Sequence, residues 1–251
     1  MRVLGVIPAR FGSTRFPGKA LVSLHGRPMI EQVMRRARRV HGLDELLVAT
    51  DDERIAEAVR HCGGAVELTG SGHATGSDRI GEVVNRRSPR PEFVVNLQGD
   101  EPLLPVAAVS GLIAAMVADP TAIWTLAAPL RAPEEFIRPS VVKIARAGDG
   151  RALYFSRAPI PHGGLEMDNP PALRHLGIYG YPIALFDRFL ALGPSRLESC
   201  ERLEQLRALE AGLTIKVALS TAGSPGVDTP EDLDRLLRRY PTLEALDGAE
   251  E

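Results

Sequence analysis

The sequence has few of the features that mark secreted, membrane-bound or nucleic-acid-binding proteins. Its two cysteines, Cys62 and Cys200, lie far apart and match no metal or redox spacing, which fits a reducing cytosol. No apolar run approaches the roughly 18 residues that cross a membrane, and the chain enters a predicted strand with no signal peptide. The formal net charge of −2 argues against broad nucleic-acid binding. We therefore expect a cytoplasmic protein with no membrane insertion and no nucleic-acid partner.

Several familiar catalytic motifs are also missing. A Walker loop has a Ser or Thr after its lysine and a shorter spacing between its glycines than Gly12 and Gly18 have, and Ala20 follows Lys19 here. No G-x-G-x-x-G fingerprint occurs, which disfavours a Rossmann oxidoreductase. The six histidines show no zinc spacing, and no G-x-S-x-G motif or Cys/His pairing indicates acyl chemistry.

Lysine is scarce. Only three of the 30 basic residues are lysines, namely Lys19, Lys143 and Lys216, and the others are arginines. A compact ammonium group is useful against phosphate, so the retention of Lys19 in a polar loop favours a phosphate site there. Genome composition is the alternative explanation of the skew.

The elements that are present predict an α/β fold. The chain has 251 residues with 44% hydrophobic and 25% charged residues, enough for one large domain. Short apolar runs at 3–7, 45–50, 65–69 and 93–97 alternate with helical patterns, which predicts a doubly wound, mostly parallel sheet. After about residue 121 this alternation of strand and helix patterns ends. We expect 122–195 to be a β-rich insertion into a nucleotide-binding core formed by 1–121 and 196–251.

A polar loop follows the first predicted strand. It carries three cations, Arg10, Arg15 and Lys19, together with glycines and the hydroxyls of Ser13 and Thr14. Glycine lets the backbone approach a ligand, and Arg and Lys supply the charge that an oligophosphate needs. Open α/β sheets bind nucleotides at such strand ends. The pattern favours a phosphate site over a solvated surface loop.

A second glycine-rich loop, at 70–79, runs into a predicted helix. Backbone amides at that helix start are suited to a base or a phosphate, although Ser77 is equally explained as an N-cap. Asp51, after the second long strand, is open to two interpretations as well, as a metal ligand or as an N-cap.

Two aspartates predict a metal site. Asp100 follows the buried strand at 93–97, where a carboxylate is well placed to hold a hard cation on a triphosphate; a plain turn is the alternative. Near the end of the chain, Thr229, Pro230 and Asp232 have the pattern of a capping box, which does not account for Asp228. Asp228 is the candidate second ligand.

The predicted insertion has polar chemistry of its own. Arg157, His175 and Tyr179 suit an acidic, hydroxylated small molecule, but His175 and Tyr179 equally suit a half-buried interface strand. A single amphipathic helix is expected at 197–211, with Glu201 and Gln205 on one polar face. That face is either solvated or part of the same site.

Further motifs run in order along nearly the whole chain. They are Ile-Pro-Ala-Arg at 7–10, Ser-Thr-Arg at 13–15, Pro-Gly-Lys at 17–19, Asn-Leu-Gln-Gly-Asp-Glu-Pro at 96–102, Tyr-Phe-Ser-Arg at 154–157, Arg-His-Leu-Gly-Ile-Tyr-Gly-Tyr at 174–181, Leu-Glu-Gln-Leu-Arg at 203–207 and Gly-Val-Asp-Thr-Pro-Glu-Asp at 226–232. Together they resemble the 3-deoxy-manno-octulosonate cytidylyltransferase family. The loop at 73–79 departs slightly, with Thr-Gly-Ser where relatives usually have Ser-Gly-Thr.

The resemblance implies an enzyme that activates Kdo for lipopolysaccharide synthesis, converting CTP and 3-deoxy-D-manno-octulosonate (Kdo) to CMP-Kdo and diphosphate. It implies a homodimer formed through the insertion, and Mg²⁺ bound by Asp100 and Asp228. The implied catalytic residues are Lys19, Arg10, Asp100 and Asp228. The implied nucleotide-binding residues are Arg10, Ser13, Arg15, Lys19, Ser77, Arg79 and Gln98. The implied sugar-binding residues are Arg157, His175, Tyr179, Glu201 and Gln205.

Two other functions stay open at this stage. The same chemistry on another acidic sugar, of the 8-amino-Kdo or sialic-acid type, would leave both glycine loops unchanged. A non-catalytic nucleotide-binding relative would be expected to have lost Lys19 or one of the two aspartates, and the chain has all three.

Overall fold

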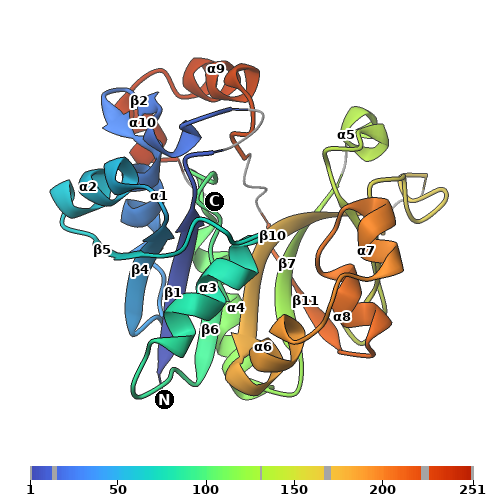
Figure 1. Cartoon of the computed structure of the whole chain (residues 1–251). Coiled ribbons are helices and arrows are strands. Elements are labelled where there is room, and N and C mark those ends of the chain that lie inside the picture. Colours follow the sequence, from blue (N-terminus) through green and yellow to red (C-terminus); the bar gives the residue numbers. More distant parts are fainter. Residues whose placement is uncertain (1, 13–15, 131, 167–170, 222–225, 250–251) are drawn as a thin grey trace. The chain divides into compact units, whose positions relative to one another are not determined.

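The computed structural model of the chain describes every residue except 1, 13–15, 131, 167–170, 222–225 and 250–251. It forms two compact units (Figure 1). Unit 1 consists of Met1–Ala107 and Ser224–Glu251, and unit 2 consists of Ala108–Gly223. The insertion expected at 122–195 falls within unit 2, and its role as an insertion stays a prediction.

Unit 1 contains four parallel strands in the order β6-β1-β4-β5. Their bounds are β1 Val3–Ala9, β4 Glu45–Thr50, β5 Ala65–Leu68 and β6 Phe93–Asn96. The strands β1 and β6 are buried almost throughout, as expected for parallel strands covered on both faces, which read as continuous apolar runs. The predicted α/β fold with a mostly parallel sheet is confirmed.

The helices of unit 1 pack onto these strands. Helix α3 contacts β1, β4 and β6, while α2 contacts β4 and β5 and packs against α1 (Figure 1). Their bounds are α1 Met29–Ala37, α2 Glu53–His61, α3 Gly76–Asn85, α9 Pro230–Arg239 and α10 Leu243–Asp247. Smaller elements are the 3-10 helix η1 Lys19–Leu21 and the strands β2 Ser23–Leu24 and β3 Arg27–Pro28.

The helix caps of unit 1 correct two expectations. Asp52, not Asp51, accepts the N-terminal hydrogen bond of α2. Thr75, not Ser77, caps α3 in a reciprocal box with Asp78. In a capping box the N-cap residue lies three positions before its acidic partner. The spacing of Thr75 and Asp78 therefore allows this cap to be predicted from the sequence. The capping box of Thr229 and Asp232 at α9 is confirmed.

Four loops of unit 1 leave the same edge of its sheet. Because all four strands are parallel, their carboxyl ends meet at one edge. Arg10 follows β1, Asp51 follows β4, Gly70 follows β5 and Gln98 follows β6. Residues far apart in the sequence are thereby gathered at one edge.

Unit 2 contains a mixed group of strands. Strand β11 is parallel to β7, β10 is antiparallel to β7 and to β8, and β9 is antiparallel to β8. Their bounds are β7 Ile123–Pro129, β8 Lys143–Arg146, β9 Ala152–Ser156, β10 Leu173–Pro182 and β11 Ile215–Leu219. The helices are α4 Val106–Ala118, which begins at the end of unit 1, then α5 Pro133–Ile137, α6 Ile183–Leu190, α7 Arg196–Glu201 and α8 Leu206–Glu210.

The prediction of a single amphipathic helix at 197–211 is wrong. The structure has two short helices, α7 and α8, separated where Arg202 adopts a left-handed conformation with φ 55°. The turn changes the direction of the chain, so the helical i, i+4 spacing of Glu201 and Gln205 does not put them on one face. The apolar pattern of Leu203, Leu206 and Leu209 does not reveal the break, since it reports burial rather than backbone direction.

Gly180 in β10 allows α4 to pack closely. A Cβ atom at this position would lie 2.8 Å from Leu112 Cδ2 and 2.8 Å from Met116 Sδ, both in fully buried side chains of α4. We expect Gly180→Ala to lower the free energy of unfolding by about 1–3 kcal/mol through overpacking. Urea unfolding measures this change.

Gly111→Ala is the matched control for that substitution. Gly111 lies in α4, and a Cβ there meets nothing within 4 Å. Alanine is the better helix former, so this variant should be as stable as the parent chain or slightly more stable. Equal stabilities of the two variants would contradict the packing argument.

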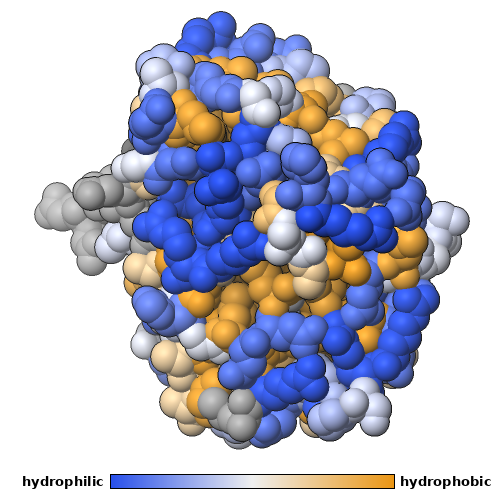
Figure 2. Space-filling model, turned by 90° about the vertical axis from the view of Figure 1, so that its left-hand side faces the viewer, coloured by the Kyte–Doolittle hydropathy of each residue, from blue (hydrophilic) through white to orange (hydrophobic). Residues whose placement is uncertain are grey.

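One face of the molecule carries both polar and apolar areas. Hydrophilic residues cover much of the face shown in Figure 2, with smaller apolar areas between them. No helix in the described part of the chain is long and apolar enough to cross a membrane.

Candidate active site

A cavity of about 320 Å³ opens at the carboxyl edge of the unit 1 sheet. Six of the residues singled out from the sequence line it, namely Arg10, Lys19, Arg79, Gln98, Asp100 and Asp228. They come from the loops after β1 and β6, from helix α3 and from the segment before α9. The structure thus gathers most of the predicted nucleotide-binding residues around one cavity.

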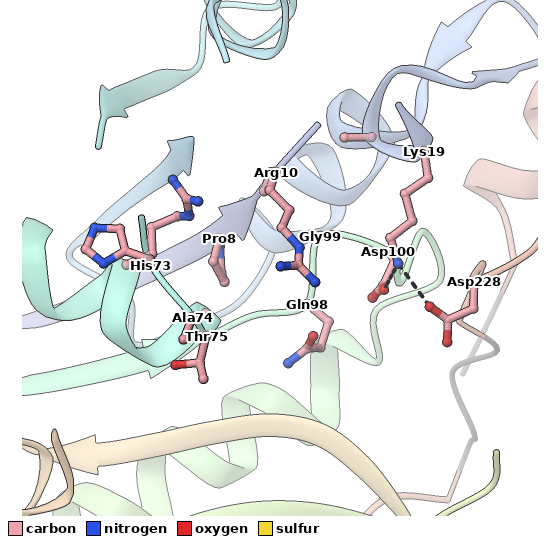
Figure 3. Close-up of a pocket in the computed structure, with 14 residues that line it drawn as sticks. Pro8, Arg10, Lys19, His73, Ala74, Thr75, Gln98, Gly99, Asp100 and Asp228 are labelled. Atoms are coloured by element: carbon pink, nitrogen blue, oxygen red, sulfur yellow. Dashed lines mark hydrogen bonds and ion pairs between the residues drawn. The ribbon is translucent and has the colours of Figure 1, made fainter. Parts of the chain in front are cut away.

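Lys19 lies between the two aspartates of this cavity. Its ammonium pairs with Asp100 and lies 3.0 Å from Asp228 Oδ1 (Figure 3). Burial alone would lower the pKa of Lys19, but the two carboxylates, Asp100 first, outweigh burial and raise it. The lysine is therefore a permanent cation at the cavity wall.

The same two carboxylates fit a divalent cation. Both reach one ammonium nitrogen, so their oxygens converge on a single point. In the described part of the chain no group of three or more His, Cys, Asp and Glu side chains is arranged to hold a metal. Mg²⁺ is usually held by one or two carboxylates, with water and substrate phosphates completing its octahedron. The donor set therefore fits a cation that is shared with a triphosphate.

Arg10 and Gln98 lie beside this cluster and face the cavity (Figure 3). Arg10 is exposed and makes no hydrogen bond with the described part of the chain, so its guanidinium is available to an anion. Gly99 follows Gln98 and packs against the first strand: a Cβ there would lie 3.1 Å from the carbonyl oxygen of Pro8. Glycine at this position permits the loop after β6 to lie close to β1.

Arg79 is held by a partner that the sequence did not indicate. Its guanidinium Nη2 lies 2.8 Å from Asp51 Oδ2, and its Nη1 donates to Thr69 and Gly70. Asp51, considered above as a metal ligand or an N-cap, instead fixes an arginine at the cavity wall.

One described nucleotide-binding candidate, Ser77, is not at the cavity, and two others are not among the described residues. Ser77 lies in the first turn of α3 with 2% exposure and does not line it. Ser13 and Arg15 lie outside the described residues. The lining also includes His73 and Thr75, which were not among the candidate residues predicted from the sequence. Both residues lie in a glycine-rich loop just before a predicted helix, and this position is the sequence feature that could have identified them as candidates.

His73 is fixed by a carboxylate. Its Nε2 pairs with Glu82, which also accepts a hydrogen bond of 2.9 Å from the amide of Gly70. The His73 contact, followed by the Gly70 amide, lowers the pKa of Glu82. A single carboxylate thus ties Gly70 and His73 of the glycine-rich loop to α3.

Two of the predicted sugar-binding residues in unit 2 bind each other. Arg157 donates its backbone N–H to Glu201 Oε2 at 2.9 Å and its Nε to the Glu201 carbonyl at 2.8 Å. The other oxygen of Glu201 accepts from Ser156 Oγ at 2.5 Å. The end of β9 is thereby joined to the end of α7.

His175 and Tyr179 lie next to each other on β10. The register of β10 against β7 shifts between Leu176 and Tyr179, and the rings of His175 and Tyr179 are 5.4 Å apart. Thr125 donates its hydroxyl proton to the carbonyl of Ile178 at 2.8 Å, so it accepts at 3.1 Å from Nε2–H of His175. This assigns the Nε2–H tautomer to the histidine.

Burial keeps both side chains neutral. It lowers the pKa of His175 to about 3 and raises that of Tyr179 well above its usual value. The hydroxyl of Tyr179 and the amide nitrogen of Gln205 are buried and have no hydrogen bond of normal geometry in the described chain. Both atoms keep hydrogen-bonding capacity, although Thr125 also interacts with the hydroxyl of Tyr179.

His175 should make folding sensitive to acid. Its pKa is about 6.5 in the unfolded chain and about 3 in the folded one, so the unfolded state binds more protons between these pH values. Stability should therefore be complete above pH 6.5 and fall as the pH drops toward 3. We expect His175→Gln to unfold with a shallower dependence on pH between about 6.5 and 4, measured by urea unfolding.

Phe155→Leu is the control for this prediction. It removes an aromatic ring that packs edge-on against His175, with centroids 5.1 Å apart, but no titratable group. It should lower stability at every pH and keep the slope of the parent chain. An unchanged slope in His175→Gln would contradict the prediction.

Comparisons with known proteins place this chain in a class and then in a family. A family model described as cytidylyltransferase matches residues 4–215. Two 3-deoxy-manno-octulosonate cytidylyltransferases are similar over most of their length. The one from Anaeromyxobacter sp. (strain K) is 51% identical over 92% of this chain and 94% of its own. The one from Syntrophobacter fumaroxidans is 48% identical over 94% of this chain and 96% of its own.

A solved structure agrees with these relatives. It is a CMP:2-keto-3-deoxy-manno-octonic acid synthetase complexed with CTP, which superposes with a TM-score of 0.88 at 39% identity, covering 94% of this chain and 97% of that one. The chain belongs to the 3-deoxy-manno-octulosonate cytidylyltransferase family. The resemblance drawn from the motifs is confirmed.

Proposed function

We propose that the chain transfers the cytidylyl group of CTP to 3-deoxy-D-manno-octulosonate, giving CMP-Kdo and diphosphate, as its relatives' names describe. The observation that carries the proposal is the cluster of Lys19, Asp100 and Asp228 at the carboxyl edge of a parallel sheet, beside the available guanidinium of Arg10. The arrangement suits an anionic nucleotide and a hard cation. CMP-Kdo made in this way would serve lipopolysaccharide synthesis.

The chemistry is a displacement at phosphorus. The C2 hydroxyl of Kdo loses its proton and forms a bond to the α-phosphorus, while the bond to the bridging oxygen breaks and diphosphate leaves. Negative charge collects on the phosphoryl and leaving oxygens, so catalysis depends on positioning and on neutralisation of charge. Arg10 and Lys19 would supply fixed positive charge to the triphosphate. Gln98 and Arg79 would help to seat the nucleotide, as would Ser13 and Arg15.

Asp100 and Asp228 would hold a divalent metal ion, which we propose to be Mg²⁺. When bound there with CTP, the ion would neutralise phosphate charge. The carboxylates would also orient Lys19, which contacts both of them in the present structure.

The sugar acid would be bound by residues of unit 2, namely Arg157, His175, Tyr179, Glu201 and Gln205. Arg157 is the cation of this set and would face the carboxylate of Kdo. Because His175 is neutral, it would act as a hydrogen-bonding group. Tyr179 and Gln205 offer buried polar atoms to sugar hydroxyls. We further propose that the protein is a cytoplasmic homodimer joined through the β-rich segment 122–195.

Diphosphate release tests the function directly. The purified chain would be given CTP and Mg²⁺ with Kdo, 8-amino-Kdo or N-acetylneuraminate, and ATP would replace CTP in a parallel series. We expect release with Kdo that requires Mg²⁺ and fails with ATP. Release only with another sugar acid would support the proposed reaction but would identify that sugar acid as the substrate. CTP binding without release from any sugar would indicate a nucleotide-binding relative that is not catalytic.

A further inference from the structure

Lys143 is a buried cation that no step of the proposed reaction uses. It lies in β8 with 0% exposure and is among the largest fully buried side chains of the described chain. Its ammonium donates to three backbone carbonyls, of Arg138 at 3.0 Å, Val141 at 2.6 Å and Arg157 at 2.5 Å. An ammonium group has three N–H donors, so this set satisfies it completely.

Such a residue is costly for stability alone. Burial, and then the neighbouring charge of Arg157, lowers the pKa of Lys143 because both disfavour the charged form. An apolar side chain of similar volume avoids that penalty, and exchanges of this kind are often neutral or stabilising. A role other than packing is therefore expected for Lys143.

All three carbonyls belong to Arg157 or to the loop that its guanidinium binds. One belongs to Arg157 itself. The other two, from Arg138 and Val141, flank Pro139, whose carbonyl accepts from Nη1 of Arg157 at 3.0 Å. Lys143 thus holds Arg157 through its backbone and through the loop that its guanidinium binds.

The guanidinium of Arg157 is fixed but not saturated. It donates Nε to Glu201 at 2.8 Å, Nη1 to Pro139 at 3.0 Å and Nη2 to Arg202 at 3.3 Å, all at backbone carbonyls. A guanidinium has five N–H donors, so one N–H remains on each terminal nitrogen. A guanidinium with one N–H left on each terminal nitrogen can donate to a carboxylate from both nitrogens.

The charge of the cluster favours an anion as well. Lys143 and Arg157 are both cations, and the carboxylate of Glu201 is the one anion that contacts Arg157 in the described chain. The cluster of Lys143, Arg157 and Glu201 therefore keeps a net positive charge. Lys143 supplies one of its two cations although the lysine side chain is fully buried.

We propose that Lys143 is a positioning residue, which holds the loop at 138–141 and the backbone of Arg157 so that the two remaining guanidinium N–H groups face the carboxylate of the acidic sugar substrate. The inference rests on the proposed function, because it takes Arg157 as the group that binds this carboxylate. It adds a residue on β8, outside the motifs that carry the family resemblance.

A double-mutant cycle on the steady-state kinetics tests the proposal. The variants are Lys143→Met, Arg157→Gln and the double variant, with Lys216→Met as the control. Lys216 is also in unit 2 but pairs with Asp119 at 2.6 Å. The Michaelis constant (KM) of each substrate and the binding of CTP alone are measured for all of them.

We expect Lys143→Met to raise the KM of the sugar acid about 10- to 100-fold, since small misplacements of a binding group cost this much. The KM of CTP and the binding of CTP should stay unchanged. The double variant should be no worse than Arg157→Gln, because Lys143 acts through that arginine. Lys216→Met should match the parent chain.

Other results would overturn the proposal. A wild-type KM for the sugar acid in Lys143→Met, or losses that add in the double variant, would show that Lys143 only supports the fold. If Lys143→Met does not fold, Lys143→Arg takes its place. It keeps the charge, but its planar fork cannot serve three carbonyls around one point, so a wild-type KM there would equally contradict us. A parent chain that binds CTP and makes no product would instead contradict the proposed function.

Discussion

Asp100→Asn is expected to lower the turnover number about 10³-fold, the loss typical of removing one preorganised electrostatic group. Asparagine has nearly the same shape as aspartate but no charge, so it would weaken the hold on a divalent cation and on Lys19. Asp228 would still pair with Lys19 at 3.0 Å, so the fold should persist. Steady-state rates of diphosphate release at saturating CTP and sugar measure the change.

Asp52→Asn is the matched control. Asp52 lies in the same unit and caps α2, a role that asparagine performs equally well. It does not line the cavity. This variant should keep the parent turnover and thermal stability. Near-normal turnover in Asp100→Asn, with the control unchanged, would show that the carboxylate does not take part in the reaction.

Lys19→Met should produce a loss of comparable size. We expect kcat/KM for CTP to fall about 10³-fold, because one fixed cation at the developing phosphate charge is lost in a partly buried site. Since the pKa of Lys19 is raised, the cation is present throughout the working pH range, and the loss should not depend on pH between about 6 and 9. Rates and CTP affinity at several pH values measure both points.

The same substitution has a consequence that is separate from activity. Without the ammonium, Asp100 and Asp228 would converge on an empty position and repel each other. Mn²⁺, a spectroscopic substitute for Mg²⁺, should then bind the nucleotide-free chain more tightly than it binds the parent, as measured by electron paramagnetic resonance. Lys19→Arg should not restore activity, because a planar fork cannot replace a point charge between two carboxylates. Full activity in either variant would show that Lys19 takes no part in the reaction.

Much of unit 1 could be predicted from local sequence. Buried parallel strands are continuous apolar runs, so β1, β4 and β6 were located closely by composition alone. The capping box at Thr229 has a fixed spacing and was found for the same reason. The motifs at 7–19 and 96–102 identified the family because they carry side chains that a turn or a strand end does not otherwise need.

Other features were decided by residues distant in the sequence. Asp51 pairs with Arg79, 28 positions away, and no local pattern distinguishes that pairing from a cap. Ser77 is buried in the first turn of α3, and Thr75 caps that helix instead. The helix expected at 197–211 broke at Arg202, although its apolar spacing suited a continuous helix.

The sequence by itself determined which chemistry the chain carries: a loop with cations, two unexplained aspartates and motifs of one family. Only the tertiary structure decided where that chemistry acts. The parallel direction of β1 and β6 brings Lys19 next to Asp100. The amide of Val227 donates to the Asp100 carbonyl at 2.9 Å, and Asp228 Oδ1 thereby lies 3.0 Å from Lys19, 209 positions away in the sequence. Folding likewise buried Lys143 against three carbonyls, which its apolar neighbours in the sequence do not reveal. The physical reason is that residue type fixes which bonds a side chain can make, whereas its partners depend on how the strands are ordered in space.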